Sequence, residues 1–216
     1  MKILIAISSL SQYEDNHKSM RDTWLPEASN LGMDYRFFVE HVDRPVRPFA
    51  GELPAYKPDS IAVEGSMTDR LKFKLQWAYE RGYDYVFSCY PDTYARPERM
   101  LTCGFDRHDY FGNVYCYPGG KAYCQGGAGY LVSRRVMEAV AKNHTSYPND
   151  DCWLGDAMYR AGIPATHSED FKQWAGSPAK SNTIVTSHLS YASNALEVPY
   201  TAKFMYDEHK KWMDSV

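Results

Sequence analysis

Short apolar runs alternate with amphipathic stretches along most of this chain of 216 residues, and that alternation constrains its fold more than any other feature. Residues 2–7 predict a buried strand, whereas residues 17–28 repeat their large apolar side chains at helical spacing. Strands that alternate with helices are typical of a largely parallel sheet with helices on both faces. No linker or repeat divides the chain, so we expect one α/β domain over residues 1–216, with ligands bound beyond the carboxyl ends of its strands.

The remaining elements follow the same alternation. The sequence predicts further strands at residues 35–39, 60–63, 83–89, 110–117, 129–132 and 183–187. It predicts helices at residues 67–81, 98–103, 133–142, 150–161 and 199–213, with Ser133 as the cap of the third. The proline-rich segment 41–57 is expected to be an irregular loop.

Composition and charge argue against several classes of protein. The net charge is -3 at pH 7 and the sequence pI is about 6.2, so bulk charge does not favour a nucleic-acid partner, although a local basic groove stays possible. No apolar run approaches the roughly 18 residues of a membrane helix, and the apolar N-terminus is too short for a secretory signal. Five cysteines without metal-binding spacing favour free thiols in a reducing compartment. We therefore expect a cytoplasmic protein, or one of the host cytoplasm if it is viral or from a phage.

Two predicted strands deliver residues suited to metal binding. The strand 83–89 runs into Tyr90, Pro91 and Asp92, and a carboxylate there can hold a divalent cation that bridges a diphosphate. An aspartate after proline is also a common turn residue. His188 follows the strand 183–187 and can complete a metal site, although a lone histidine is more often structural.

Asp150 and Asp151 stand together at the start of a predicted helix. One of them can act as a general base that takes the proton of an acceptor hydroxyl. Its neighbour can then tune the base by like-charge repulsion. The alternative is that both residues cap the helix.

Two further features are weak when taken alone. The glycine cluster at residues 125–130 precedes a strand rather than following one, so it is no Rossmann turn. Its glycines let the backbone approach a ligand closely, or form a plain turn. Arg21, on the first predicted helix, can reach a phosphate or make a surface ion pair.

Taken in chain order, these features resemble the β-1,3-galactosyltransferases and Fringe-like glycosyltransferases, which have the GT-A fold. The resemblance runs from Met1 to about Tyr206. It rests on residues 1–7, 21–24, 77–94 and 126–133, on the pair 150–151 with Gly155, and on His188. It implies the mixed, mostly parallel sheet of that fold, without the membrane anchor and stem of the animal enzymes, as in bacterial, phage or large-virus members.

The metal strand of that family ends in three consecutive aspartates, and the third binds Mn²⁺ together with the donor diphosphate. Here the three positions read Tyr90, Pro91 and Asp92, so this chain departs from the family at two of them. A late histidine of the family is its second metal ligand. The resemblance therefore implies Asp92 and His188 as ligands of Mn²⁺ (or Mg²⁺).

The resemblance also implies a base and a donor-binding set. Asp151 takes the position of the catalytic base, beside Asp150. Arg70, with Lys72 close by, stands near the position at which a family lysine meets the donor. The donor-binding residues that the resemblance implies are Ser8, Arg21, Arg70, Lys72, Tyr90, Asp92, Gly127, Ala128 and Gly129.

The activity implied is a single inverting displacement from a nucleotide sugar, with a UDP-sugar as the expected donor. Asp151 takes the proton of the acceptor hydroxyl, whose oxygen attacks the anomeric carbon through an oxocarbenium-like transition state. The metal neutralises charge on the leaving diphosphate, and Arg21 and Arg70 assist it.

A hydroxyl of a glycan or glycoprotein is the acceptor that the family implies. Phage-type glycosylation of hydroxymethylated bases in DNA is an alternative, and it requires a basic groove. The replacement of two aspartates by Tyr90 and Pro91 supports another alternative, a sugar-nucleotide or glycan binding module without turnover. The retention of Asp92, Asp151 and His188 together favours a working enzyme.

Overall fold

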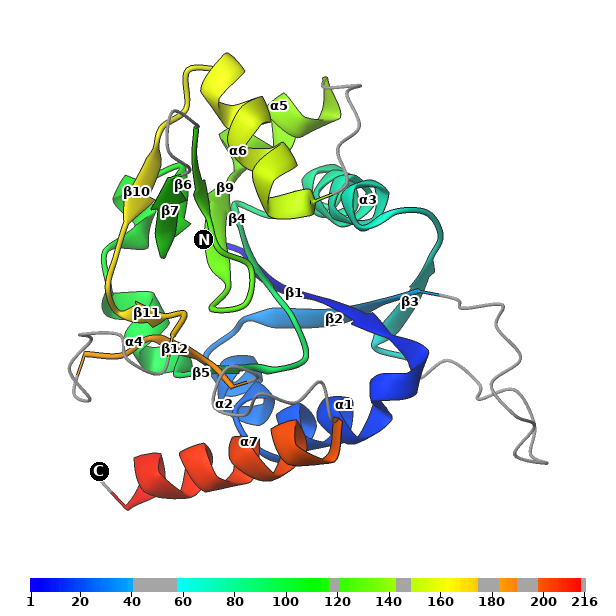
Figure 1. The fold of residues 1–216 in the computed structure, drawn as a ribbon, viewed down its shortest axis with the longest axis vertical. Helices are drawn as coiled ribbons and strands as arrows, with labels where there is room; N and C mark the ends of the chain where they lie inside the picture. The colour runs from blue at the N-terminus through cyan, green and yellow to red at the C-terminus, as the bar shows by residue number, and fades with distance from the viewer. Residues whose placement is uncertain (41–57, 117–120, 143–148, 175–182, 190–197, 215–216) are drawn as a thin grey trace.

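The computed structural model describes residues 1–40, 58–116, 121–142, 149–174, 183–189 and 198–214, with the backbone alone at residues 198–201. The predicted loop 41–57 lies outside the described residues. A seven-stranded sheet crosses the protein in the order β10-β6-β9-β4-β1-β2-β3 (Figure 1). Its strands are β1 (Ile3–Leu10), β2 (Asp34–Glu40), β3 (Ser60–Val63), β4 (Tyr85–Cys89), β6 (Tyr110–Gly112), β9 (Tyr130–Ser133) and β10 (Ala165–His167).

The sheet is mixed and mostly parallel, as predicted. Strand β1 pairs in parallel with β2 and β4, β2 with β3, and β6 with β10. Only β9 runs the other way, antiparallel to both β4 and β6. Strand β1 is buried along almost its whole length, which is typical of a central parallel strand covered on both faces.

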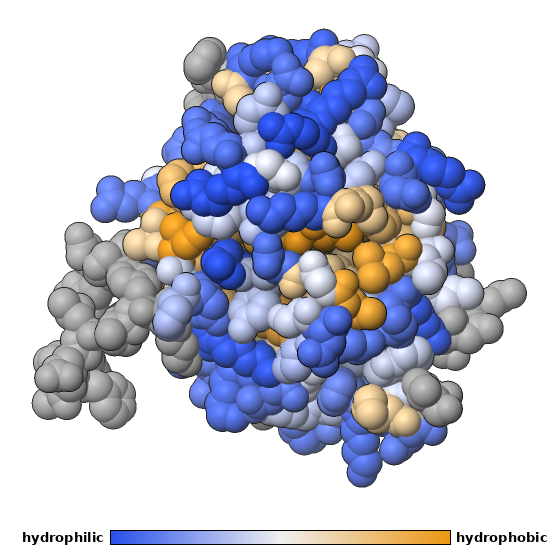
Figure 2. Space-filling view, turned by 180° about the vertical axis from the view of Figure 1, so that it is seen from behind, coloured by the Kyte–Doolittle hydropathy of each residue, from blue (hydrophilic) through white to orange (hydrophobic). Residues whose placement is uncertain are grey.

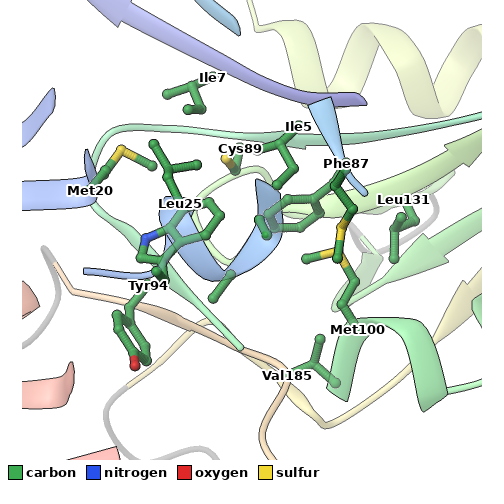
Figure 3. Close-up of a cluster of buried hydrophobic side chains, with 14 of the residues drawn as sticks. Ile5, Ile7, Met20, Leu25, Phe87, Cys89, Tyr94, Met100, Leu131 and Val185 are labelled. Atoms are coloured by element: carbon green, nitrogen blue, oxygen red, sulfur yellow. The ribbon is translucent and has the colours of Figure 1, made fainter. Parts of the chain in front are cut away.

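Helices cover both faces of the central sheet (Figure 1). Ile5 and Ile7 of β1 point into one buried cluster, whereas Leu4 and Ala6 point into the other, because successive side chains of a strand face opposite sides. Figure 3 shows part of the first cluster, which α1, α2 and α7 cover. Helices α3, α5 and α6 cover the second cluster. The helices are α1 (Glu14–Asp22), α2 (Leu25–Asn30), α3 (Met67–Glu80), α5 (Arg134–Ala141), α6 (Asp150–Arg160) and α7 (Val198–Met213).

A small second sheet determines where the candidate site forms. Its strands lie in the order β11-β12-β5, with β12 antiparallel to β5 and parallel to β11. Helix α4 (Pro97–Thr102) follows β5, and β7 (Val114–Cys116) pairs separately with β8 (Ala122–Cys124). The strands of the small sheet are β5 (Thr93–Ala95), β11 (Phe171–Lys172) and β12 (Thr186–His188).

The prediction of one helix over residues 17–28 is wrong. The chain forms α1 and α2 instead, with a break at Thr23, whose ψ of -94° is not helical. Pro26 explains the break. Proline has no N–H to donate to the carbonyl of Asp22, four residues earlier, and its ring clashes with that carbonyl.

The predicted strand 110–117 is also two elements. Strands β6 and β7 belong to different sheets and are separated at Asn113. The Asn113 carbonyl accepts a hydrogen bond from Gln125 N (2.8 Å), and its Nδ2 donates to the carbonyl of Phe171 (3.0 Å). These contacts come from distant parts of the chain, so local periodicity did not indicate the break.

Helix α5 begins after Ser133, but the predicted side-chain cap is absent there. The Ser133 hydroxyl donates instead to Asp109 Oδ1 (2.5 Å). Helix α6 does have a cap, since Asn149 Oδ1 accepts a hydrogen bond from Cys152 N (3.0 Å).

The outer surface agrees with the composition. Seen from behind, it is mainly hydrophilic, and hydrophobic residues gather in a strip across its middle (Figure 2). Within the described ranges, no helix combines the length and the apolar character that crossing a membrane requires.

Candidate active site at the carboxyl end of β4

The site begins where β4 ends at Cys89 and the chain continues into Tyr90, Pro91 and Asp92. The glycine cluster precedes β9, and β9 runs antiparallel to β4, with Tyr130 opposite Ser88. The start of β9 and the end of β4 therefore lie at the same edge of the sheet. Because β9 is antiparallel to β4, the glycine cluster that precedes β9 lies beside the residues that follow β4.

Cys89 itself takes no part in this edge. Its side chain points into the apolar cluster with Leu25 and Ile5 (Figure 3). Burial raises the pKa of the Cys89 thiol far above its usual range, so it stays protonated and inert. All five cysteines lie in the described part of the chain, and none of them forms a disulfide.

The structure brings together the two residues predicted as metal ligands. In the small sheet His188 stands opposite Thr93, the neighbour of Asp92. The His188 Nε2 atom lies 2.9 Å from Asp92 Oδ2, and Leu189 N donates to the Asp92 carbonyl (2.9 Å). Both side chains are largely buried.

Gln173 is a member of this cluster that sequence reasoning missed. It follows β11, is 4% exposed, and accepts a hydrogen bond at Oε1 from Ala128 N (2.7 Å). Its Nε2 atom lies 3.0 Å from His188 Nδ1. No sequence signal marks this glutamine, because its partners come from two segments far from it in the chain.

The glycine cluster is packed against the side chains of the site. A Cβ added to Gly127 would lie 2.4 Å from His188 Nδ1, and one added to Gly126 would lie 2.6 Å from Tyr90 Cε2. Gly129 has φ +74° and would press a Cβ to 2.5 Å from Phe87. The glycines thus have a packing role beside the predicted donor-binding one. The side chain of Ala128, also predicted to bind the donor, is fully buried and points away from solvent.

The two adjacent aspartates at the start of α6 have different partners. Asp150 is 4% exposed, and its Oδ2 accepts a hydrogen bond from the Tyr90 hydroxyl (2.6 Å). Asp151 Oδ2 accepts one from Gly126 N (2.7 Å). Among the described residues, Asp151 Oδ1 has no hydrogen-bond partner. Burial, and then the charge of Asp150, raise the pKa of Asp151 to about 8.

Lys74 is the second residue that sequence reasoning missed. It is 1% exposed, and its Nζ donates to Ser8 Oγ (2.7 Å) at the carboxyl end of β1. Burial lowers the pKa of Lys74 to about 8, although Asp150 and Asp151 oppose that shift. Its position could have been found, since it shares a helical stripe with the apolar residues Leu71 and Leu75.

The predicted lysine, Lys72, faces elsewhere. Its Nζ lies 4.9 Å from the ring centroid of Trp153, between α3 and α6. Arg70, one turn before Lys74, pairs with Glu40 at the carboxyl end of β2 (2.7 Å). Of the two predicted residues of α3, Arg70 therefore lies at the edge of the site.

Arg21 does not join the site. Its guanidinium donates twice to Asp59, from Nε to Oδ2 (2.9 Å) and from Nη2 to Oδ1 (3.0 Å). It also lies over the ring of Phe37, which belongs to the cluster on the opposite face of the sheet from Lys74. The central sheet thus separates Arg21 from Lys74 and from the aspartates of α6, whereas the small sheet with Asp92 and His188 packs on the same cluster as Phe37. The contacts of Arg21 are those of the ion-pair alternative.

The residues present, in their observed hydrogen bonds, do not fit a divalent cation. Within the described ranges, no group of three or more histidine, cysteine, aspartate or glutamate side chains is arranged to hold one. The His188 nitrogen that would face a metal bonds to Asp92 instead, and its other nitrogen faces a side-chain amide. Mn²⁺ therefore stays a prediction from the resemblance, and no chemical step below depends on it.

Comparisons with known proteins come from structure alone, since no family model and no curated protein matches this sequence. A glycosyltransferase involved in the glycosylation of the major capsid of PBCV-1 aligns at a TM-score of 0.54 and 12% identity, over 96% of this chain and 100% of that one. A proposed nucleotide-diphospho-sugar transferase from Desulfovibrio desulfuricans G20 aligns at 0.47 and 14% identity, over 78% and 80%. The first alignment shows that this chain has the fold of a solved glycosyltransferase along nearly its whole length.

Proposed function

We propose that this protein is a glycosyltransferase that moves a sugar from a nucleotide-sugar donor to a hydroxyl acceptor, with Asp151 as the base. One observation carries the proposal. At the carboxyl edge of a mostly parallel sheet, two adjacent carboxyl groups differ in their partners and lie near the buried cation Lys74. A buried carboxyl with a raised pKa beside a second carboxyl is typical of catalytic sites.

The geometry supports different roles for the two aspartates. Asp150 is buried and accepts a hydrogen bond from the Tyr90 hydroxyl, so it is suited to tuning the basicity of Asp151. Asp151 keeps one oxygen without a partner among the described residues, and a base needs such an oxygen to accept a proton. The raised pKa of Asp151 makes it a stronger base than an ordinary carboxylate near neutral pH.

The mechanism that follows is a single displacement with inversion. Asp151 takes the proton as the acceptor oxygen attacks the anomeric carbon, and the nucleotide diphosphate leaves from the opposite face. We assign Arg70 as the cation that assists the leaving group, since it pairs with Glu40 at the carboxyl end of β2 while Lys74 is bonded to Ser8. We assign a UDP-sugar as donor, from the resemblance to the Fringe-like enzymes.

A glycan or glycoprotein is the acceptor we favour. One solved structure with this fold is a glycosyltransferase involved in the glycosylation of the major capsid of PBCV-1, which supports this choice. A hydroxymethylated base in DNA remains an alternative. It predicts duplex binding that weakens steeply with added salt, which a glycan acceptor does not require.

The test is release of nucleotide from a panel of nucleotide sugars, because many glycosyltransferases slowly pass the sugar to water. The variants are Asp151→Asn and, as the matched control on the same helix, Asp156→Asn, which pairs with Arg160 at the surface (2.8 Å). We expect one donor to be cleaved by the wild type and the control, and not by Asp151→Asn, which still binds it.

Two outcomes would contradict the proposal. Donor binding without cleavage by any variant, with or without acceptor, would indicate the binding module. Equal cleavage by Asp151→Asn and wild type would remove the assigned base.

A further inference from the structure

We infer that Gln173 is a positioning residue that holds the His188 ring in the tautomer that donates to Asp92, and so keeps this pair from binding a divalent cation. The inference concerns three side chains and one backbone amide, which connect the starts of β9 and β5 with the ends of β11 and β12. It is independent of whether the protein transfers a sugar.

A backbone amide determines the direction of these hydrogen bonds. The N–H of Ala128 can only donate, so the Gln173 atom 2.7 Å from it must be the carbonyl oxygen Oε1. The other end of Gln173 is then the NH₂ group, which has no lone pair to offer. His188 Nδ1, 3.0 Å from that group, must accept and carries no proton.

The proton of the neutral ring is therefore on Nε2. That nitrogen lies 2.9 Å from Asp92 Oδ2 and donates to it. For the neutral ring, the tautomer of His188 therefore follows from the network of hydrogen bonds.

This tautomer is the wrong one for a metal. A cation binds the lone pair of an unprotonated nitrogen, and a metal-bound histidine usually donates its other N–H to a carboxylate, a carbonyl or water. For Nε2 of His188 to bind a cation, the proton would have to move to Nδ1. There it would meet the N–H of Gln173, and two donors would face each other.

The other ring nitrogen offers no alternative site. The Nδ1 edge of His188 packs so closely on Gly127 that a single added carbon would lie 2.4 Å from it. Gln173 is 4% exposed, so water does not readily replace it. Both ring nitrogens are thus held in protein hydrogen bonds.

The replacement of two family aspartates by Tyr90 and Pro91 also disfavours a bound cation. Tyr90 and Pro91 stand where the resemblance implies two more carboxylates, and the Tyr90 hydroxyl is bonded to Asp150. The cluster therefore keeps the carboxylate and imidazole of a metal site while the described residues around it favour a direct hydrogen bond between them.

One substitution reverses the effect. In Gln173→Glu, the carboxylate can accept from both Ala128 N–H and His188 Nδ1–H, which leaves the Nε2 lone pair for a cation. We would measure Mn²⁺ binding to the full chain without donor, by electron paramagnetic resonance. We expect Gln173→Glu to bind Mn²⁺ about tenfold more tightly than wild type or more, the size of outer-shell effects on metal affinity.

The controls separate tautomer from charge. Gln12→Glu, which adds the same charge at an exposed position, is expected to have the Mn²⁺ affinity of the wild type. Adding His188→Ala to Gln173→Glu is expected to abolish the gain. Equal Mn²⁺ affinities of wild type and Gln173→Glu, whether both tight or both weak, would overturn the inference.

A second measurement covers the case in which Gln173→Glu fails to fold. The ¹⁵N signals of the His188 ring in the wild type report which nitrogen carries the proton. A protonated Nε2 with an unprotonated Nδ1 supports the inference, and a proton on Nδ1 overturns it. Neither measurement involves turnover, so the outcome is separate from that of the transferase proposal.

Discussion

Two pairs of neighbouring acidic residues can be compared in this protein. One pair lies on each face of its central sheet. Asp150 and Asp151 lie at the carboxyl edge of the sheet, beside Tyr90 and the buried Lys74. Glu27 of α2 interacts with Glu98 of α4 on the other face. Both pairs contain one carboxyl with a raised pKa, to about 8 in Asp151 and about 7 in Glu27, and burial is the first cause in each.

The difference between the pairs lies in their surroundings. The aspartates are held by the Tyr90 hydroxyl and the Gly126 N–H, which lie at the edge of the sheet where ligands of such sheets bind. The glutamates join two short helices beside the apolar core. A raised pKa therefore occurs both in a candidate catalytic pair and in a structural contact between helices. The two are distinguished only by their position in the fold and by their hydrogen-bond partners.

The largest expected effect is the loss of nucleotide release when the proposed base is replaced. Asp151→Asn removes the proton acceptor, so we expect nucleotide release to fall by about 10²–10⁴-fold. Glu27→Gln changes the corresponding carboxyl of the other pair and should leave the rate unchanged. Steady-state rates with a single donor check both, and a loss of rate in Glu27→Gln would erase the distinction.

Lys74 lies near the aspartate pair, and its contribution can be measured as a change in the free energy of unfolding. Lys74→Met removes the buried hydrogen bond to Ser8 and the cation whose charge acts on Asp150 and Asp151, and a hydrogen bond to a charged group contributes about 1.5–3 kcal/mol. Lys72→Met, two residues away, removes a cation–π contact with Trp153, worth about 1 kcal/mol or less. Unfolding in urea measures both, and equal losses would contradict the role given to Lys74.

Tyr90→Phe tests what distinguishes Asp150 from Glu98. The substitution deletes the hydroxyl that donates to Asp150, and hydrogen bonds to charged groups contribute about 1.5–3 kcal/mol. We expect lower stability and an altered pH dependence of nucleotide release, since the charge of Asp150 acts on Asp151. An unchanged pH profile would show that Tyr90 has only a packing role. Tyr83→Phe, which deletes a hydroxyl bonded to Asp34 far from the site, is the matched control.

The smallest effect concerns Glu27 and pH. Its pKa in the folded protein is raised to about 7, above the usual value, so the protonated form is the stabilising one. Stability from this group is present below its unfolded pKa and is lost as pH rises towards about 7. Glu27→Gln should therefore gain stability relative to wild type as pH rises from about 4 to 7. Thermal unfolding across this range checks it, and a constant difference would contradict it.

The local features of the fold were largely predictable. The strand 60–63 and the helix beginning at Met67 agree with the structure, because periodicity and the Ser66–Asp69 capping box are encoded within a few residues. The short strands β5, β8, β10 and β11 were missed, since two or three residues contain no period to detect. They form only because partner strands from elsewhere in the chain meet them.

The candidate site divides in the same way. Asp92, His188, Asp150 and Asp151 were found from their positions after strands or at a helix start. Arg21 was misplaced relative to Lys74 and the aspartates of α6, because the face of the sheet on which α1 packs is not readable from its residues.

The sequence by itself thus determined the alternation of strands and helices, the mostly parallel sheet and the residue types at its strand ends. These depend on periodicity and residue type, which act over short distances along the chain. Only the tertiary structure decided that Lys74 rather than Lys72 is bonded to Ser8 at the end of β1, and that Gln173 contacts His188. Both depend on which atoms meet across segments 66 and 15 residues apart, and hydrogen-bond direction and burial exist only once those segments are packed.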